Sequence, residues 1–203
     1  MTYRFEIMPQ VAAAKAIAIV RESTRTDGRR VVDALVAAGM PALEVTCPTP
    51  GAFDLVDSLR DGVALVGMGT VLSASEAVDA AHAGALFIVT PNVDADVIRA
   101  AHRHGLATII GCGTATEIVT ALEYGADACK VFPAEQLGMG FIKAIHGPLP
   151  HAPLIPVGGV DVANAADWLN AGAVAVGMGS KLTKGDATII ASNVKTLLAN
   201  LGL

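Results

Sequence analysis

The segment Ala107–Pro133, ATIIGCGTATEIVTALEYGADACKVFP, shows how this chain is built. An apolar run is followed by a Gly/Thr turn, an amphipathic helical pattern that ends at Gly125, and a second apolar run. Continuous apolar runs, without the alternation of a half-buried strand, are typical of parallel strands that helices cover. The segment therefore predicts a strand–helix–strand unit of a parallel sheet.

The same unit recurs along the rest of the chain. We predict eight strands at Ala16–Arg21, Ala42–Cys47, Ala64–Thr70, Leu86–Pro91, Ala107–Cys112, Ala128–Pro133, Leu154–Gly159 and Ala173–Gly179. Helical patterns lie between them, and four of these follow a residue suited to N-capping, namely Asp27, Ser73, Asp94 and Asp161. Five end at a glycine suited to the left-handed C-terminal position, namely Gly39, Gly84, Gly105, Gly125 and Gly172.

Eight strands alternating with eight helices, without a linker, predict a single (β/α)8 TIM barrel over residues 1–203. Tyr3–Lys15 is expected to form an extra N-terminal helix that closes the bottom of the barrel. The alternative is a doubly wound open sheet. That fold would call for a dinucleotide fingerprint, and the stretch GMGTVLS at 67–73 lacks its third glycine.

Composition narrows the class of protein. Hydrophobic residues make up 53% of the chain and charged residues 16%, and the net charge is -5 without a basic cluster. We therefore expect no nucleic-acid partner and no anionic membrane partner. No apolar run reaches the about 18 residues of a membrane span, and the N-terminus lacks a signal-peptide core, so a cytoplasmic enzyme is expected. Cys47, Cys112 and Cys129 are interpreted as reduced core thiols, and no metal site is expected from their spacing or from that of the histidines.

Lys130 interrupts the apolar run ACKVFP. Lysine is rarely buried, and an ammonium in an apolar setting must be paired or lose its proton. One reading is structural: the side chain reaches solvent or pairs with an acid. The other is a lysine of lowered pKa that attacks a carbonyl group and forms a Schiff base.

In a (β/α)8 barrel the carboxyl ends of the strands carry the active site. The polar and turn-forming residues at these ends are Arg21, Glu44, Thr46, Gly69, Thr70, Thr90, Pro91, Gly111, Thr114, Lys130, Gly158, Gly159, Gly179 and Ser180. One lysine, one acid, one arginine and several glycine turns are compatible with carbonyl chemistry.

Three of these features have competing interpretations. Glu44 is either the partner of a buried cation or a carboxyl of raised pKa that relays protons through a water molecule. Arg21 either holds an anionic substrate group or pairs with Glu44. The paired glycine turns at 158–159 and 179–180 are either tight turns or a phosphate-binding backbone, since barrels commonly hold phosphate after strands seven and eight.

Six motifs, in order, resemble one known family. They are LEVT (43–46), GMGTVL (67–72), VTPN (89–92), KVFPAE (130–135), VGGV (157–160) and VGMGS (176–180). From Ala16 to Leu182 the chain resembles the class I aldolases of 2-keto-3-deoxy-6-phosphogluconate (KDPG) and 2-keto-3-deoxy-6-phosphogalactonate (KDPGal).

The resemblance implies a lyase that releases pyruvate and glyceraldehyde 3-phosphate, without a metal or cofactor, in a homotrimer. It makes Lys130 the Schiff-base lysine and Glu44 the general acid and base. Gly69, Thr70 and Pro91 would line the pyruvate end of the substrate site. Gly158, Gly159, Gly179 and Ser180 would hold the phosphate.

Departures from the family pattern favour the KDPGal branch. KDPG-type members usually have an arginine shortly after the LEVT glutamate, where this chain has Cys47–Pro50. They also tend to have threonine before the paired glycine, where this chain has Val157. Arg21 at the end of the first strand is likewise more similar to the KDPGal branch. The C4 stereochemistry of the substrate is left open by these residues.

Two other functions remain compatible with the same barrel. A phosphosugar epimerase or isomerase would use the same phosphate-binding turns, but such enzymes work with carboxylates or a metal rather than a mid-barrel lysine. A non-catalytic phosphosugar-binding protein is the other alternative. Covalent trapping of pyruvate separates the aldolase from both.

Overall fold

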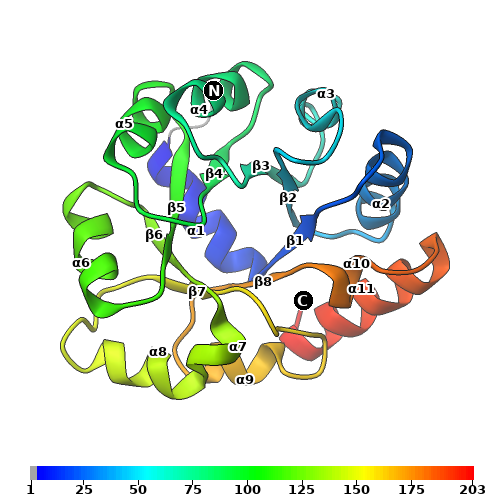
Figure 1. The fold of residues 1–203 in the computed structure, drawn as a ribbon. Helices are drawn as coiled ribbons and strands as arrows, with labels where there is room; N and C mark the ends of the chain where they lie inside the picture. Colours follow the sequence, from blue (N-terminus) through cyan, green and yellow to red (C-terminus); the bar gives the residue numbers. More distant parts are fainter. Residues whose placement is uncertain (1–3) are drawn as a thin grey trace.

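A computed structural model describes residues 4–203 of the chain. Its eight strands pair in parallel, in the order β7-β6-β5-β4-β3-β2-β1-β8. A parallel bridge between Val157 and Gly177 joins the end of β7 to β8 and completes the barrel. Figure 1 shows the helices arranged around the central strands. The predicted (β/α)8 barrel is confirmed.

The strands are β1 (Ala16–Val20), β2 (Ala42–Thr46), β3 (Leu65–Gly69), β4 (Phe87–Val89), β5 (Ala107–Cys112), β6 (Ala128–Val131), β7 (Leu154–Pro156) and β8 (Val176–Met178). Each lies within the predicted apolar run, but β8 begins three residues after the predicted Ala173. Ala173 and Ala175 are buried, and the Val174 N–H already donates a hydrogen bond to the Leu154 carbonyl of β7, although regular pairing with β1 begins only at Val176.

The helices are α1 (Arg4–Ala14), α2 (Arg25–Ala37), α3 (Ala52–Asp57), α4 (Ala74–His82), α5 (Ala95–Arg103), α6 (Ala115–Glu123), α7 (Ala134–Leu137), α8 (Met139–His146), α9 (Ala165–Asn170), α10 (Ser180–Thr183) and α11 (Ala187–Leu201). Each strand is followed by a helix, as predicted, and two short helical turns, α7 and α10, are additional. No helix within residues 4–203 has the length and apolar character needed to cross a bilayer.

Helix α1 is the predicted extra N-terminal helix. Tyr3, where it was expected to begin, lies outside the described residues. Ile7 and Val11 on its buried face pack in one cluster with Ile17, Phe87 and Ile109 of the strands. Because these strand residues point into the barrel, α1 closes one end of the barrel, as expected.

Two of the four predicted N-caps are correct. Ser73 forms a complete capping box with Glu76, and the carboxylate of Asp94 accepts hydrogen bonds from two backbone N–H groups of α5. Asp27 is not an N-cap: α2 begins one turn earlier, where the Thr24 hydroxyl accepts a hydrogen bond from the Asp27 N–H.

Asp161 is also not the N-cap of the following helix. Its carboxylate accepts hydrogen bonds from the N–H groups of Ala163 and Asn164, which form a turn that precedes α9. The five predicted C-terminal glycines all have positive φ, as the left-handed position requires.

Strand alternation decides which side chains face the barrel interior. In β6, Ala128 belongs to the interior cluster, whereas Cys129 and Val131 pack outward against the helices. Lys130 is therefore in phase with Ala128 and points inward. By the same alternation Glu44 is in phase with Ala42 of β2, which also belongs to the interior cluster. Both charged side chains are thus directed into an otherwise apolar barrel.

Candidate active site

Lys130 lies in β6 and is 4% exposed. Burial lowers its pKa; the negative charge of Glu44 opposes this shift, and the positive charge of Arg21 adds to it. The amino group lies 5.0 Å from the centre of the Phe132 ring, whose face favours the protonated form. The structure therefore gives this lysine the enclosed setting in which a neutral amine becomes available at lower pH than for an exposed lysine.

Glu44 lies in β2 and is 2% exposed. Burial raises its pKa, and the charges of Lys130 and Arg21 oppose that shift. Within residues 4–203 its Oε1 atom has no hydrogen-bond partner, and no ion pair joins the carboxylate to Lys130 or Arg21. The interpretation of Glu44 as a purely structural salt-bridge partner is therefore not supported. The carboxylate is thus buried with one oxygen that no group of residues 4–203 satisfies.

Gly69 gives the Glu44 side chain its space. A Cβ atom at position 69 would lie 1.9 Å from Glu44 Oε1, well inside any real contact distance. Glycine at the end of β3 is thus required by the carboxylate that crosses from β2.

Arg21 extends from the end of β1 toward the end of β3. Its Nη2 atom donates a hydrogen bond to Thr70 Oγ1 at 3.2 Å. Thr70 has a φ of 56°, which is unusual for a β-branched residue. A guanidinium and a hydroxyl held together at the strand ends form a suitable site for a carboxylate.

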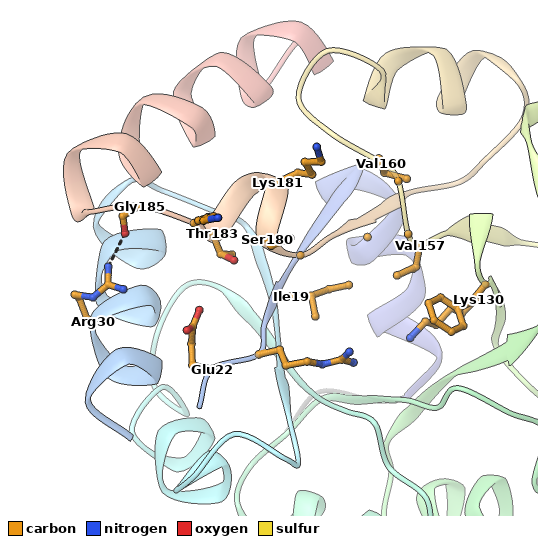
Figure 2. A pocket seen from close by; sticks show the side chains of 17 residues that line it. Ile19, Glu22, Arg30, Lys130, Val157, Val160, Ser180, Lys181, Thr183 and Gly185 are labelled. Carbon is orange, nitrogen blue, oxygen red and sulfur yellow. Dashed lines mark hydrogen bonds between the residues drawn. The ribbon is translucent and has the colours of Figure 1, made fainter. Parts of the chain in front are cut away.

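A cavity of about 480 Å³ opens beside Lys130 (Figure 2). Of the predicted site residues, it is lined by Arg21, Lys130, Gly158, Gly159, Gly179 and Ser180. The described lining does not include Glu44, in the middle of β2, or Gly69, Thr70 and Pro91, at the ends of β3 and β4. The structure thus brings the lysine and the paired glycine turns into one cavity, with the acid buried to one side.

Comparison with known proteins identifies the family. The family model "KDPG and KHG aldolase" matches residues 7–198. The 2-dehydro-3-deoxy-6-phosphogalactonate aldolase of Escherichia coli (strain K12) is 38% identical over 177 residues, which cover 85% of this chain and 86% of that protein. This chain belongs to the KDPG and KHG aldolase family. It is an aldolase, and so a carbon–carbon lyase, of the kind its motifs resemble.

Solved structures agree with this family. The structure described as native KDPGal superposes with a TM-score of 0.86 at 35% identity and covers 92% of this chain and 94% of that one. The KDPG aldolase of Legionella pneumophila, with pyruvate captured as a covalent carbinolamine intermediate, has a TM-score of 0.78 at 28% identity. It covers 95% of each chain.

Three threonines at the strand ends of this aldolase have structural roles. Thr46 Oγ1 lies 3.1 Å from Thr49 Oγ1. Thr90 Oγ1 donates to the Asn92 carbonyl and accepts from the Gly111 N–H, and Thr114 is the N-cap of α6. Pro91 packs closely on Gly111. A Cβ atom at position 111 would lie 2.2 Å from the Pro91 carbonyl carbon, so only glycine fits at this position.

Further cavity residues of the aldolase were not found from the sequence. They are Glu22, Arg30, Val160, Lys181, Thr183, Lys184 and Gly185, together with the Phe132 ring. Lys181 directly follows the Gly179–Ser180 turn and Lys184 comes three residues later, so this basic sequence could have indicated them. Arg30 carries no such signal, because it lies on α2, far along the chain from the turn.

Residues 4–203 contain no cluster of three or more His, Cys, Asp or Glu side chains arranged to bind a metal ion. The groups that the described residues bring to this site are the Lys130 amine, the Glu44 carboxyl group, the Arg21 guanidinium and the two glycine turns.

Proposed function

We propose that the protein cleaves 2-keto-3-deoxy-6-phosphogalactonate into pyruvate and glyceraldehyde 3-phosphate through a Schiff base on Lys130. The observation that carries this proposal is the buried, inward-facing Lys130 of lowered pKa in the same cavity as two glycine turns. The carbinolamine of the Legionella pneumophila relative, formed with pyruvate, supports covalent chemistry in this family.

The reaction begins when the neutral Lys130 amine attacks the C2 ketone. The carbinolamine loses water, and the resulting iminium accepts the electron pair of the C3–C4 bond. Glu44, through a water molecule, takes the proton of the C4 hydroxyl, so glyceraldehyde 3-phosphate leaves as the aldehyde. The enamine is then protonated at C3, and hydrolysis of the iminium releases pyruvate and the free amine.

Glu44 suits this relay because its pKa is raised by burial and its Oε1 atom has no partner among the described residues. An acid of raised pKa accepts and returns a proton near neutral pH more readily than an exposed glutamate.

The two anionic groups of the substrate are assigned to different residues. Arg21 and Thr70, joined by their hydrogen bond, would hold the C1 carboxylate, with Gly69 and Pro91 lining the same end. Gly158, Gly159, Gly179 and Ser180 would hold the phosphate through backbone N–H groups and the serine hydroxyl. The glycine φ values of 95° at 158 and 76° at 159 support this role, because they place the backbone in a conformation that side chains disfavour.

The overall reaction is tested by analysing the products. Purified protein incubated with the substrate should form pyruvate and glyceraldehyde 3-phosphate in equal amounts, and prior dialysis against a strong chelator should not change the rate. An isomerised sugar acid without pyruvate would instead assign the protein to the epimerase or isomerase class. Binding without any turnover would make it a phosphosugar-binding protein.

Arg21 should also control the pH dependence of the reaction. Its positive charge lowers the pKa of Lys130 and of Glu44. In Arg21→Gln both pKa values should therefore rise. The pyruvate-trapping rate, which increases with pH as Lys130 loses its proton, should then increase at a higher pH than in the wild type. The matched control is Arg99→Gln, an exposed arginine on α5. An unchanged pH dependence in Arg21→Gln would show that the guanidinium is too well screened to act on the amine.

We predict a modest preference in kcat/KM for the galactonate epimer. The epimers differ at C4, and Val157, which lines the cavity, offers no hydrogen bond there. Val157→Thr adds a hydroxyl in nearly the same volume, so the kcat/KM ratio of gluconate to galactonate epimer should rise about tenfold. Rates on the two epimers, measured side by side, check this. A wild type at least tenfold better on the gluconate epimer would refute the preference.

We also propose that the protein is a homotrimer and that it is located in the cytoplasm. The trimer is inferred from the family resemblance, and light scattering of the purified protein tests it. The cytoplasmic location is supported by three cysteines, Cys47, Cys112 and Cys129, that are free thiols in the structure.

A further inference from the structure

Arg30 links two elements that are far apart in the chain. It lies on α2, lines the cavity, and donates a hydrogen bond from Nη1 to the Gly185 carbonyl oxygen at 2.7 Å (Figure 2). The two residues are 155 positions apart. Its Nη2 atom lies 3.5 Å from Asp27 Oδ1 on the same helix. Both ends of the guanidinium fork are therefore engaged by protein groups.

Gly185 ends the short segment that begins with the second glycine turn. Between them lies α10, in which the Lys184 N–H donates to the Ser180 carbonyl at 3.1 Å. Leu182 and Thr183 of this segment are buried. Gly185 has a φ of 116°, and a Cβ there would lie 2.9 Å from Ile189 Cγ2. The segment 179–185 is thus a compact turn of helix whose two ends lie within one short, internally hydrogen-bonded unit.

We propose that Arg30 is a positioning residue for the substrate phosphate. By holding the Gly185 carbonyl it fixes the end of segment 179–185, and with it the Gly179–Ser180 turn that the proposed function assigns to the phosphate. The inference rests on that proposed function and extends it. Arg30 acts through the segment and not by touching the phosphate, because its guanidinium already binds Gly185 and faces Asp27.

Position matters at this turn because backbone N–H groups cannot follow a displaced ligand as a flexible side chain can. Hydrogen bonds weaken steeply with distance and angle, so small shifts of a preorganised turn reduce affinity for the anion. Losing the contact should therefore weaken phosphate binding without changing the chemistry at Lys130.

The test compares Arg30→Ala with the wild type. We expect KM for the phosphorylated substrate and the competitive Ki of inorganic phosphate to rise about tenfold, the scale of one charge-assisted hydrogen bond. The value of kcat and the rate of borohydride trapping with pyruvate, which has no phosphate, should stay within twofold. Arg29→Ala is the matched control, because Arg29 neighbours Arg30 on α2 but pairs with Asp33.

A double-mutant cycle separates the effect of the Arg30–Gly185 hydrogen bond from the effect of the Arg30 charge. Gly185→Ala disturbs the same contact from the other side, since it strains φ and meets Ile189. If both residues act through one contact, the double variant loses no more affinity for phosphate than the worse single variant. Additive losses, or an unchanged phosphate Ki in Arg30→Ala, would overturn the inference. Absence of pyruvate trapping in the wild type would instead overturn the proposed function itself.

Discussion

Lys130→Arg is expected to lower kcat on the order of 10⁴-fold or more, the scale of losing a covalent nucleophile. A guanidinium remains protonated in proteins and cannot attack a ketone, although it preserves the positive charge. In the wild type, pyruvate and borohydride should add one reduced pyruvyl group at Lys130, which peptide mass spectrometry would detect. The same treatment of Lys130→Arg should leave no adduct.

Lys143→Arg serves as the matched control, because Lys143 lies exposed on α8 and outside the cavity. It should keep both the adduct and the turnover. An adduct on a different lysine of the wild type would refute the Schiff-base assignment, as would a Lys130→Arg protein that still cleaves the substrate at near wild-type rate.

Glu44→Gln is expected to reduce kcat by about 10²–10⁴-fold, the usual contribution of a positioned proton relay. Glutamine keeps the shape and the hydrogen-bonding ability of the side chain, but it does not exchange a proton. The rate is measured with saturating substrate. Glu123→Gln, at the exposed end of α6, is the control and should be as active as the wild type.

The Glu44→Gln variant should not be less stable than the wild type. Burial raises the pKa of Glu44 in the folded state, so the charged form is disfavoured by folding. The stability that this carboxyl contributes is present below its unfolded pKa of about 4.3 and is lost as pH rises through its raised folded pKa. The Tm of Glu44→Gln relative to wild type should therefore increase from pH 4 to 8. A decrease would mean that the carboxylate is a stabilising partner.

The barrel was predictable because its signal is repeated in every unit. Apolar runs and C-terminal glycines each point to the same alternation, so an error at one position does not change the fold. The exact residue at which a helix or strand begins is harder to predict, because neighbouring residues can be equally suited to that position. Thr24 and Asp27 are both good N-caps, and which one begins α2 depends on how the chain leaves β1. Similarly, the apolar Ala173 is buried but precedes β8 and is not part of it.

Site residues were predictable where their chemistry conflicts with their surroundings. Lys130 and Glu44 are charges within apolar runs, and alternation places both side chains inside the barrel. What the local sequence does not encode is tertiary proximity. The hydrogen bond from Arg21 to Thr70 and the contact of Arg30 with Gly185 join residues that no spacing rule connects. Glu44 could likewise not be called unpaired until the folded structure was known.

Of the neighbouring strand pairs in the barrel, β7 and β8 share the least backbone pairing. Each of these strands has three residues. One bridge joins them, together with a hydrogen bond from the Val174 N–H, just before β8, to the Leu154 carbonyl of β7, whereas every other neighbouring pair shares three to five register positions. Sheets open first where their cohesion is least. The two glycine turns assigned to the phosphate leave from these same two strands. If the phosphate spans both turns, as we propose, ligand binding should stabilise the folded barrel by about 2.7 kcal/mol at a concentration one hundred times its Kd. We therefore expect the ligand-free enzyme to open more readily between β7 and β8 than the enzyme with its phosphorylated substrate bound.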